Sequence, residues 1–245
     1  MAKQSTATAT PVLLTRPEAQ SRAFAEALVL RFGDRLRCVV APTMAPIFLS
    51  PHLPEGHFDA VIFTSATAVN AARMLGTPLP TRAWCVGART AEAAQAAEFN
   101  ASSANGDADD LVAAILSDPP KGRLLHLRGQ DSRGNVAERL TAHGITTISA
   151  IFYRQEPQPL TPEAIALLQD PAPLILPIFS PGSAAVLAAA LPTTTLARLH
   201  IAAISAAVAE AAASIPHVAL VTARNPDADG MLNGVGTLLA ANPLP

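Results

Sequence analysis

Short runs of apolar residues, each followed by an alanine-rich segment, recur along the whole chain and constrain its fold more than any other feature. The runs span residues 12–15, 60–64, 84–86, 123–127, 174–179, 200–204 and 218–222. Each has the length of a buried strand, and the segments after them read as helices. Alternating strands and helices imply parallel sheets with helices on both faces, so the sequence predicts an α/β fold.

The composition favours packed cores and argues against several classes of partner. Of the 245 residues, 50% are hydrophobic and 15% charged, which is too apolar for a disordered chain. A net charge of −2 lacks the basic surplus of a nucleic-acid binder. Cys38 and Cys85 have neither disulfide-scaffold nor zinc spacing. Because the sequence has no signal-peptide or membrane-spanning pattern, we expect a cytoplasmic protein that contacts no membrane. We also expect a monomer that contacts no nucleic acid.

An internal echo indicates two similar domains. Residues 63–75 resemble residues 179–191, and the sequences WCVGARTAEAAQ and IAAISAAVAEAA follow them at nearly equal spacing. A looser pair is LLHLRGQD at 124–131 and LVTARNPD at 220–227, and LLTRPEAQ at 13–20 is a further copy. Alanine-rich composition alone also produces such echoes. A period this long does not fit a solenoid, whereas two similar α/β domains fit it.

Two extended, proline-punctuated segments bracket the middle of the chain and predict where it crosses between the domains. Residues 38–45 and 148–157 are expected to form connector strands. Residues 1–37 and 158–245 then form one domain, and residues 46–147 form the inserted domain. The predicted fold class is two similar doubly wound parallel-sheet (flavodoxin-like) domains joined by a two-stranded β connector, with a ligand cleft between them.

The turns after the predicted strands are rich in small hydroxyl residues. Such turns meet at the carboxyl edge of a parallel sheet, and helix N-termini there can hold carboxylates or phosphates through free N–H groups. An ordinary helix N-cap has the same sequence signature, so capping alone stays an alternative. The candidates are Thr64 and Ser65; Gly87, Ala88 and Arg89; Ser180, Gly182 and Ser183; and Ser205.

Arginines and one tyrosine add further candidates. Arg16, Arg89 and Arg128 stand at predicted strand ends, where a guanidinium can bind a carboxylate through two hydrogen bonds, although each reads equally as a solvated surface charge. Tyr153 is the only tyrosine and lies in a connector strand. Its phenol is a neutral hydrogen-bond donor, and simple packing at a domain junction is the alternative.

Several catalytic motifs are absent from the sequence. It contains no GxGxxG after the first strand, no GxxxxGK[ST] and no GxSxG, which argues against nucleotide binding and a serine-hydrolase site. The histidines show no HExxH or paired ligand spacing. We therefore predict no cofactor and no metal.

Taken together, several stretches resemble the uroporphyrinogen-III synthase family. They are LLTRPEAQ, DAVIFTSATAVNAA, WCVGARTAEAA, LHLRGQDSRGNVAERLTAHGITTISAIFYR, IFSPGSAAVLAA and AAISAAVAEAA, which span nearly the whole chain. The resemblance implies two α/β domains with a ligand cleft. It also implies a cofactor-free lyase of haem biosynthesis, which closes the linear tetrapyrrole hydroxymethylbilane into uroporphyrinogen III with inversion of ring D and loss of water.

The resemblance also implies residue roles. Tyr153 matches the family's linker tyrosine, which assists departure of the hydroxyl group. The hydroxyl turns match Thr64, Ser65, Ser180 and Ser183, with Arg16, Arg128 and Gly129 at strand ends. Where many relatives have a Gly-Pro-Thr-Thr type turn, this chain has Ser205. The order Gly182–Ser183 reverses that of some members, which leaves open which hydroxyl faces the cleft. The rival function is a non-catalytic two-domain module that binds a small polyanion.

Overall fold

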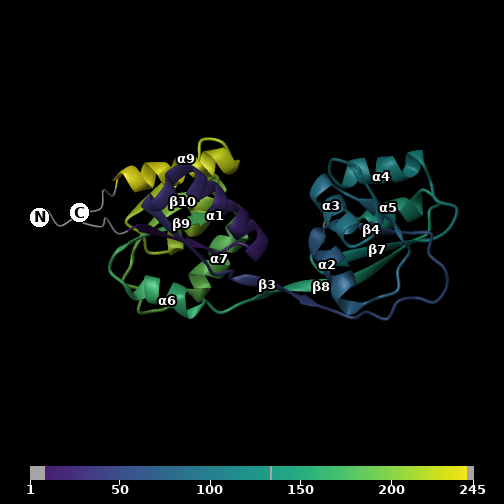
Figure 1. Ribbon diagram of the computed structural model, residues 1–245, viewed down its shortest axis with the longest axis horizontal. Coiled ribbons are helices and arrows are strands. Elements are labelled where there is room, and N and C mark those ends of the chain that lie inside the picture. Colours follow the sequence, from purple (N-terminus) through teal and green to yellow (C-terminus); the bar gives the residue numbers. More distant parts are fainter. Residues whose placement is uncertain (1–8, 133, 242–245) are drawn as a thin grey trace, which may run out of the picture. The chain divides into compact units, whose positions relative to one another are not determined.

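The computed structural model, which describes residues 9–132 and 134–241, contains two sheets built from alternating strands and helices (Figure 1). Unit 1 comprises the described residues up to Ala45 and those from Pro157 onward, and unit 2 comprises Pro46–Glu156. The predicted fold class of two similar α/β domains with parallel sheets is confirmed.

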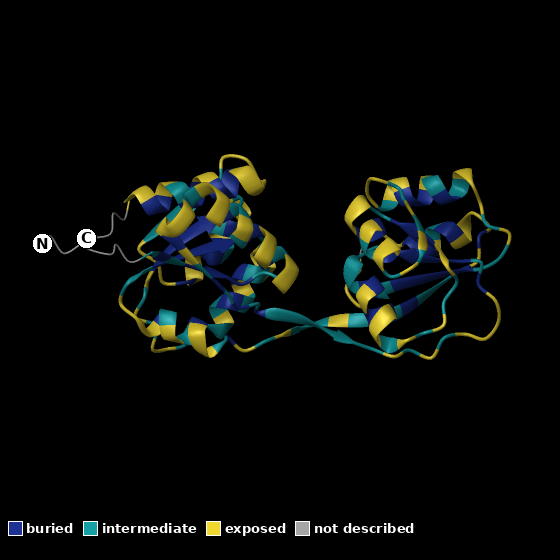
Figure 2. Ribbon diagram, in the orientation of Figure 1, coloured by how far each residue is buried: buried dark blue, intermediate teal, exposed yellow. Residues whose placement is uncertain are grey.

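The sheet of unit 1 has the strand order β11, β10, β9, β1, β2, and all its strands are parallel. Val12 and Leu14 of β1 pack with α1 and α9, whereas Leu13 packs with α6, α7 and α8. Helices therefore bury both faces of the sheet, which is why its strands read as nearly continuous apolar runs (Figure 2). The elements are β1 (Thr10–Leu14), α1 (Glu18–Phe32), η1 (Gly33–Arg35), β2 (Leu36–Val40), α6 (Pro162–Gln169), β9 (Pro173–Ile178), α7 (Pro181–Ala190), β10 (Arg198–Ala203), α8 (Ala206–Ala211), η2 (Ala212–Ser214), β11 (Ala219–Thr222) and α9 (Ala228–Ala241).

The sheet of unit 2 has the order β3, β8, β7, β4, β5, β6. Its strands β8, β7, β4, β5 and β6 are all parallel to one another. Val61 and Phe63 of β4 pack with α2 and α3, and Ala60 and Ile62 with α4 and α5. The elements are β3 (Met44–Phe48), β4 (Ala60–Phe63), α2 (Ala66–Leu75), β5 (Arg82–Cys85), α3 (Ala88–Ala96), β6 (Asn100–Ser103), α4 (Ala108–Ser117), β7 (Leu124–Gly129), α5 (Val136–Ala142) and β8 (Thr147–Pro157).

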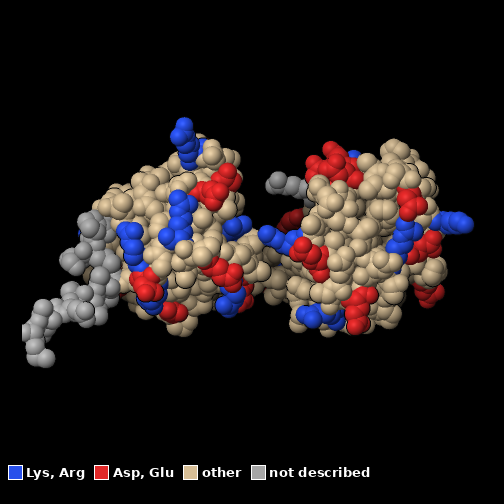
Figure 3. Space-filling model, turned by 45° about the horizontal axis from the view of Figure 1, so that its top comes forward, with Lys and Arg blue, Asp and Glu red and all other residues tan. Residues whose placement is uncertain are grey.

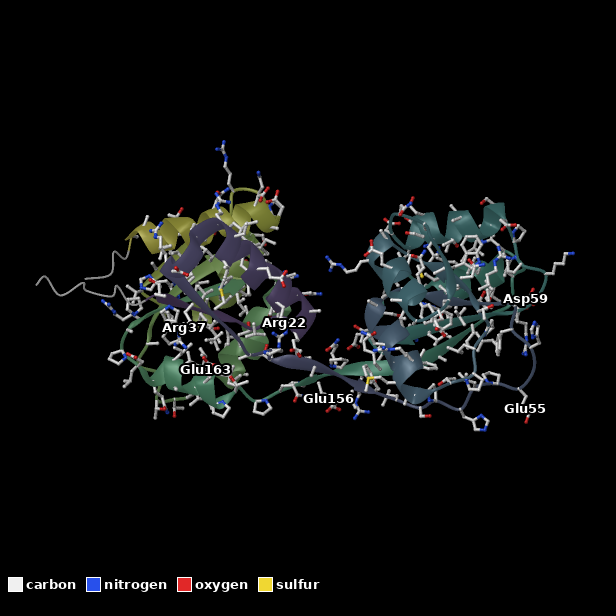
Figure 4. The ribbon with its side chains drawn as sticks, viewed as in Figure 1. Arg22, Arg37, Glu55, Asp59, Glu156 and Glu163 are labelled. Atoms are coloured by element: carbon white, nitrogen blue, oxygen red, sulfur yellow. The ribbon has the colours of Figure 1, made fainter. Side chains whose placement is uncertain are left out.

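The connector strand predicted at residues 38–45 needs correction. Cys38 and Val40 belong to β2, which pairs in parallel with β1 in the sheet of unit 1. Beside Cys38, Arg37 forms an ion pair with Glu163 of α6, 3.1 Å between Nη1 and Oε1 (Figure 4). The extended strand that pairs with β8 is β3 instead. β-Branched residues predict extended backbone, but they do not show which strand will be the partner.

β3 runs antiparallel to β8. The Leu49 N–H donates to Phe152 O (2.9 Å) and the Gln158 N–H donates to Thr43 O (2.8 Å), so the residue numbers of the two strands run in opposite directions. The strands β3 and β8 thus carry the chain into unit 2 and out of it as one antiparallel pair.

The two units share one spatial arrangement of strands but different chain orders. Counted along the chain, the strand order is 2-1-3-4-5 in unit 1 and 3-2-1-4-5 in the parallel part of unit 2. The two sheets match when β9, β10 and β11 are placed on β4, β5 and β6, and β1 and β2 on β7 and β8. Residues 13–20 are therefore the counterpart of residues 124–131. The prediction that residues 124–131 and 220–227 are equivalent segments of the two domains is wrong, because β11 corresponds to β6.

Candidate active site

A hollow in unit 2 lies where the strand order reverses. The chain proceeds from β4 to β5 on one side and from β7 to β8 on the other, and such a switch point is the usual ligand crevice of an open α/β sheet. The hollow has a volume of about 520 Å³. It brings together four predicted site residues, which are Thr64, Ser65, Gly129 and Tyr153.

Ser65 and Tyr153 form a hydrogen-bonded pair in this hollow. Ser65 caps α2, and its Oγ accepts a hydrogen bond from the N–H of Ala68 (3.1 Å). The Tyr153 hydroxyl lies 3.0 Å from the same Oγ. Since the cap already occupies one lone pair of Ser65, the serine hydrogen can go to the phenol oxygen, and the phenol hydrogen is then free for a ligand.

The ring of Tyr153 lies directly on Gly129. The register between β7 and β8 slips after Arg128, so that Gly129 pairs with Tyr153 and Phe152 is bulged out of the ladder. A Cβ on Gly129 would lie 2.6 Å from Cζ of the tyrosine, which is closer than a side chain allows. A β-bulge re-aims side chains, and here the glycine provides the space for the re-aimed ring.

Thr64 is linked to a buried histidine that sequence reasoning left without a role. His126 of β7 is 2% exposed, and its Nε2 lies 3.3 Å from Thr64 Oγ1. Burial, together with the charge of Arg128, lowers the pKa of His126 to about 4. His126 is therefore neutral at pH 7. Its signal in the sequence was a polar residue inside the otherwise apolar run LLHL.

The hollow also carries acidic side chains that were not predicted. Asp107, Asp109 and Asp131 line it. Asp107 caps α4 and accepts from the N–H groups of Asp109 and Asp110, and the Asp109 carboxylate pairs with Arg139 at 2.7 Å. The face drawn in Figure 3 shows acidic and basic side chains interspersed on each unit.

Other predicted residues of unit 2 lie outside the lining. Gly87, Ala88 and Arg89 form the first turn of α3, where Gly87 is the N-cap and Ala88 and Arg89 are exposed. Arg128 bends back onto its own turn, and its Nη1 donates to Gly129 O, Gln130 O and Ser132 Oγ. That guanidinium holds the loop after β7 in place.

The remaining predicted residues belong to unit 1. Ser180 caps α7 by accepting from the Ser183 N–H (3.0 Å), and the two hydroxyl oxygens are 2.8 Å apart. Gly182, between them, is exposed. Ser205 precedes α8 and makes no side-chain cap. The Arg16 guanidinium stacks 4.0 Å above the ring of Phe179. These residues stand at the carboxyl ends of β1, β9 and β10 in the sheet of unit 1. The hollow of unit 2 lies at the carboxyl ends of the strands of its own sheet.

In residues 9–132 and 134–241, no group of three or more His, Cys, Asp or Glu side chains is arranged to hold a metal ion. None of the helices in this part of the chain combines the length and the apolar character that a membrane crossing requires.

Comparison with known proteins decides the family. Residues 23–233 match the family model described as uroporphyrinogen-III synthase HemD. The chain belongs to the uroporphyrinogen-III synthase family. The resemblance drawn from the sequence is thereby confirmed. None of the curated proteins matches the chain.

Two solved uroporphyrinogen-III synthase structures resemble this chain at low sequence identity. The uroporphyrinogen-III synthetase of Helicobacter pylori is 17% identical with a TM-score of 0.60, and the match covers 94% of this chain and 99% of that one. A mutant uroporphyrinogen III synthase from the extremely thermophilic bacterium Thermus thermophilus is 19% identical over 96% and 100% of the two chains, with a TM-score of 0.43. The first comparison supports the two-unit α/β fold.

Proposed function

We propose that the chain is a uroporphyrinogen-III synthase, a lyase of tetrapyrrole and haem biosynthesis. On this proposal it closes hydroxymethylbilane, a linear tetrapyrrole with carboxylate arms, into uroporphyrinogen III, with inversion of ring D and loss of water. Family membership supports the reaction. One observation links the reaction to particular residues. Tyr153 and Ser65 form a hydrogen-bonded pair that lines a hollow at a topological switch point.

The first chemical step is loss of the hydroxymethyl oxygen. Tyr153 donates its hydroxyl hydrogen to that oxygen, the carbon–oxygen bond breaks and water leaves, while Ser65 donates to the phenol oxygen and stabilises its growing negative charge. The pyrrole nitrogen supplies the electron pair, so the tetrapyrrole becomes an azafulvene cation. The substituted carbon of ring D attacks this cation and gives a spiro intermediate, and the bond from that carbon to its original methylene bridge then breaks, which leaves the cation on that methylene. The unsubstituted carbon of the inverted ring D forms the final bond to this methylene and gives up its proton, and Tyr153 regains one.

The acidic lining suits the cation. Asp107, Asp109 and Asp131 place negative charge around the hollow, and fixed negative charge stabilises a developing positive charge without having to reorganise. The azafulvene is reactive enough to close without help. The protein therefore has to position ring D for attack through its substituted carbon, rather than supply a strong acid.

The carboxylate arms of the substrate need hydrogen-bond donors, which the carboxylates of Asp107, Asp109 and Asp131 cannot provide. We assign them to hydroxyls, N–H groups and guanidinium groups at the carboxyl ends of both sheets. In unit 2 these are Thr64, Gly129, Arg128 and the first turn of α3 at Gly87, Ala88 and Arg89. In unit 1 they are Arg16, Ser180, Gly182, Ser183 and Ser205.

The test is an isomer assay. The purified chain is incubated with freshly prepared hydroxymethylbilane, the product is oxidised, and uroporphyrin isomers are separated by chromatography. We expect isomer III in excess over a protein-free control. Isomer I alone, even with tight binding of the tetrapyrrole, would refute the proposal and favour the non-catalytic binding module.

A further inference from the structure

His126 is a buried titratable side chain that contacts Thr64 of the hollow and that the proposed reaction leaves unused. It is in register with Ile62 of β4 on one side and with Ser149 of β8 on the other. Its neighbours Leu124 and Ile62 face the core beneath α4 and α5. A polar ring in this position must find hydrogen-bond partners within the sheet, because burying it unpaired is costly.

Both ring nitrogens have a hydroxyl partner. Nε2 lies 3.3 Å from Thr64 Oγ1, and Nδ1 lies 3.5 Å from Ser149 Oγ. Thr64 lines the hollow, whereas Ser149 does not. The three side chains thus form a row that begins in strand β8, passes through the buried imidazole and ends at the hollow.

A neutral imidazole carries one hydrogen, so two directions of donation are possible. With the hydrogen on Nε2, Ser149 donates to Nδ1, His126 donates to Thr64, and the threonine hydrogen is left for the hollow. With the hydrogen on Nδ1, the Thr64 hydroxyl donates its hydrogen bond to Nε2. The half-buried hydroxyl of Ser149 then needs another acceptor, and the described residues provide it with no other hydrogen bond. The first direction leaves the one free hydrogen of the row on Thr64, which lines the hollow.

We propose that His126 is a positioning residue, which holds Thr64 so that its hydroxyl donates into the hollow to a carboxylate arm of the substrate. The inference rests on the proposed function for the identity of that acceptor. A carboxylate only accepts hydrogen bonds, so a threonine whose lone pairs faced it would repel it. A row that sends the hydrogen toward the hollow therefore prepares Thr64 before the substrate arrives.

The tautomer is measured directly by nuclear magnetic resonance. The full chain is labelled with ¹⁵N-histidine, and the His126 signals are assigned by their loss in His126→Gln. At pH 7 we expect the hydrogen on Nε2 and Nδ1 as the unprotonated nitrogen. In Ser149→Ala, which removes the donor to Nδ1, we expect this preference to weaken. A hydrogen on Nδ1 in the native chain would overturn the inference, whatever the isomer assay shows.

Kinetics with hydroxymethylbilane provide the second readout. We expect His126→Leu to raise KM roughly three- to tenfold with kcat within about twofold, as fits loss of a neutral hydrogen bond made to ground state and transition state alike. His126→Gln, whose amide can still donate to Thr64, should recover most of the KM. In a Thr64→Val background, His126→Leu should change KM by less than about 1.5-fold.

The matched control is His200→Leu, which removes a histidine that is also buried (3% exposed) but lies on β10 of unit 1. It should lower stability without the change in KM. An equal effect of His126→Leu with and without Thr64, or a fall in kcat alone, would mean that His126 acts through packing. If His126→Leu fails to fold, the tautomer and Ser149→Ala still decide the question. If no variant or native chain makes isomer III, the proposed function fails while the tautomer measurement stands by itself.

Discussion

The hydroxyl oxygens of Tyr153 and Ser65 lie 3.0 Å apart, although 88 positions separate the two residues in the chain. One comes from the strand that leaves unit 2 and the other from the N-cap of α2. The serine therefore has two tasks, since its oxygen ends a helix and also holds the phenol. Substitutions at Tyr153 and at Ser65 separate these two tasks.

Tyr153→Phe should lower kcat for isomer III roughly tenfold to hundredfold and leave KM nearly unchanged. The substitution removes one hydroxyl that donates in the transition state and keeps the ring on Gly129. Stopped-flow kinetics with isomer analysis measure the effect, and the thermal midpoint checks that the fold is retained. Unchanged turnover would remove the tyrosine from the mechanism.

Ser65→Ala should lower both stability and kcat. Loss of the N-cap costs about 1 kcal/mol, and loss of the partner of Tyr153 should slow isomer III formation several-fold. Thr161→Ala is the matched control, because Thr161 caps α6 in the same way, accepting from the Ala164 N–H at 3.2 Å, and is not among the residues that line the hollow. Urea titration should give similar stability losses, and only Ser65→Ala should slow turnover. Equal kcat in both variants would contradict the role of Ser65.

Much of this fold was predictable because local patterns determine it. The apolar runs became strands, and the runs at 60–64 and 123–127 became β4 and β7 with nearly the expected bounds. Gly144 follows the end of α5 and has φ of +86°, a value that favours glycine. Strand pairing was harder. Residues 38–40 read as an extended connector, yet their partner is β1, and nothing local in that sequence distinguishes the two.

The candidate site was only partly predictable for the same reason. Thr64 and Ser65 follow a strand, so their place at the sheet edge follows from topology. The contact of Gly129 with Tyr153 depends on a bulge after Arg128, and His126 depends on the cross-strand register that brings it to Ser149. Asp107 and Asp109 come from the start of α4 after β6, and Asp131 comes from the loop after β7. Such contacts between distant segments appear only once the sheet is assembled.

Gly129→Ala should reduce both activity and stability. Its new Cβ would meet Cζ of Tyr153 at 2.6 Å, so the ring must move away from Ser65. We expect a loss of roughly 1–3 kcal/mol, typical of an overpacked site, and a fall in kcat comparable to that of Tyr153→Phe. Gly234→Ala is the control, since its Cβ would meet Ala202 Cβ at an ordinary 3.7 Å within α9. A Gly129→Ala variant that stays active and stable would show that Tyr153 does not need its close contact with Gly129.

His126 should make the protein lose stability as the pH falls from about 6.5 to about 4. Burial, with the nearby Arg128 charge, lowers the folded-state pKa from 6.5 to about 4, so within this range the unfolded chain binds a proton that the folded chain does not. The free energy of unfolding then decreases with falling pH by roughly 3 kcal/mol in total, and the loss levels off below the folded pKa. The pKa of His200 is also lowered by burial and acts in the same direction, but that residue is common to the native chain and to His126→Gln. The difference between the two proteins in urea titrations at pH 7, 6, 5 and 4 therefore isolates His126. Parallel stability curves would show that the pKa of His126 is the same in the folded and the unfolded chain.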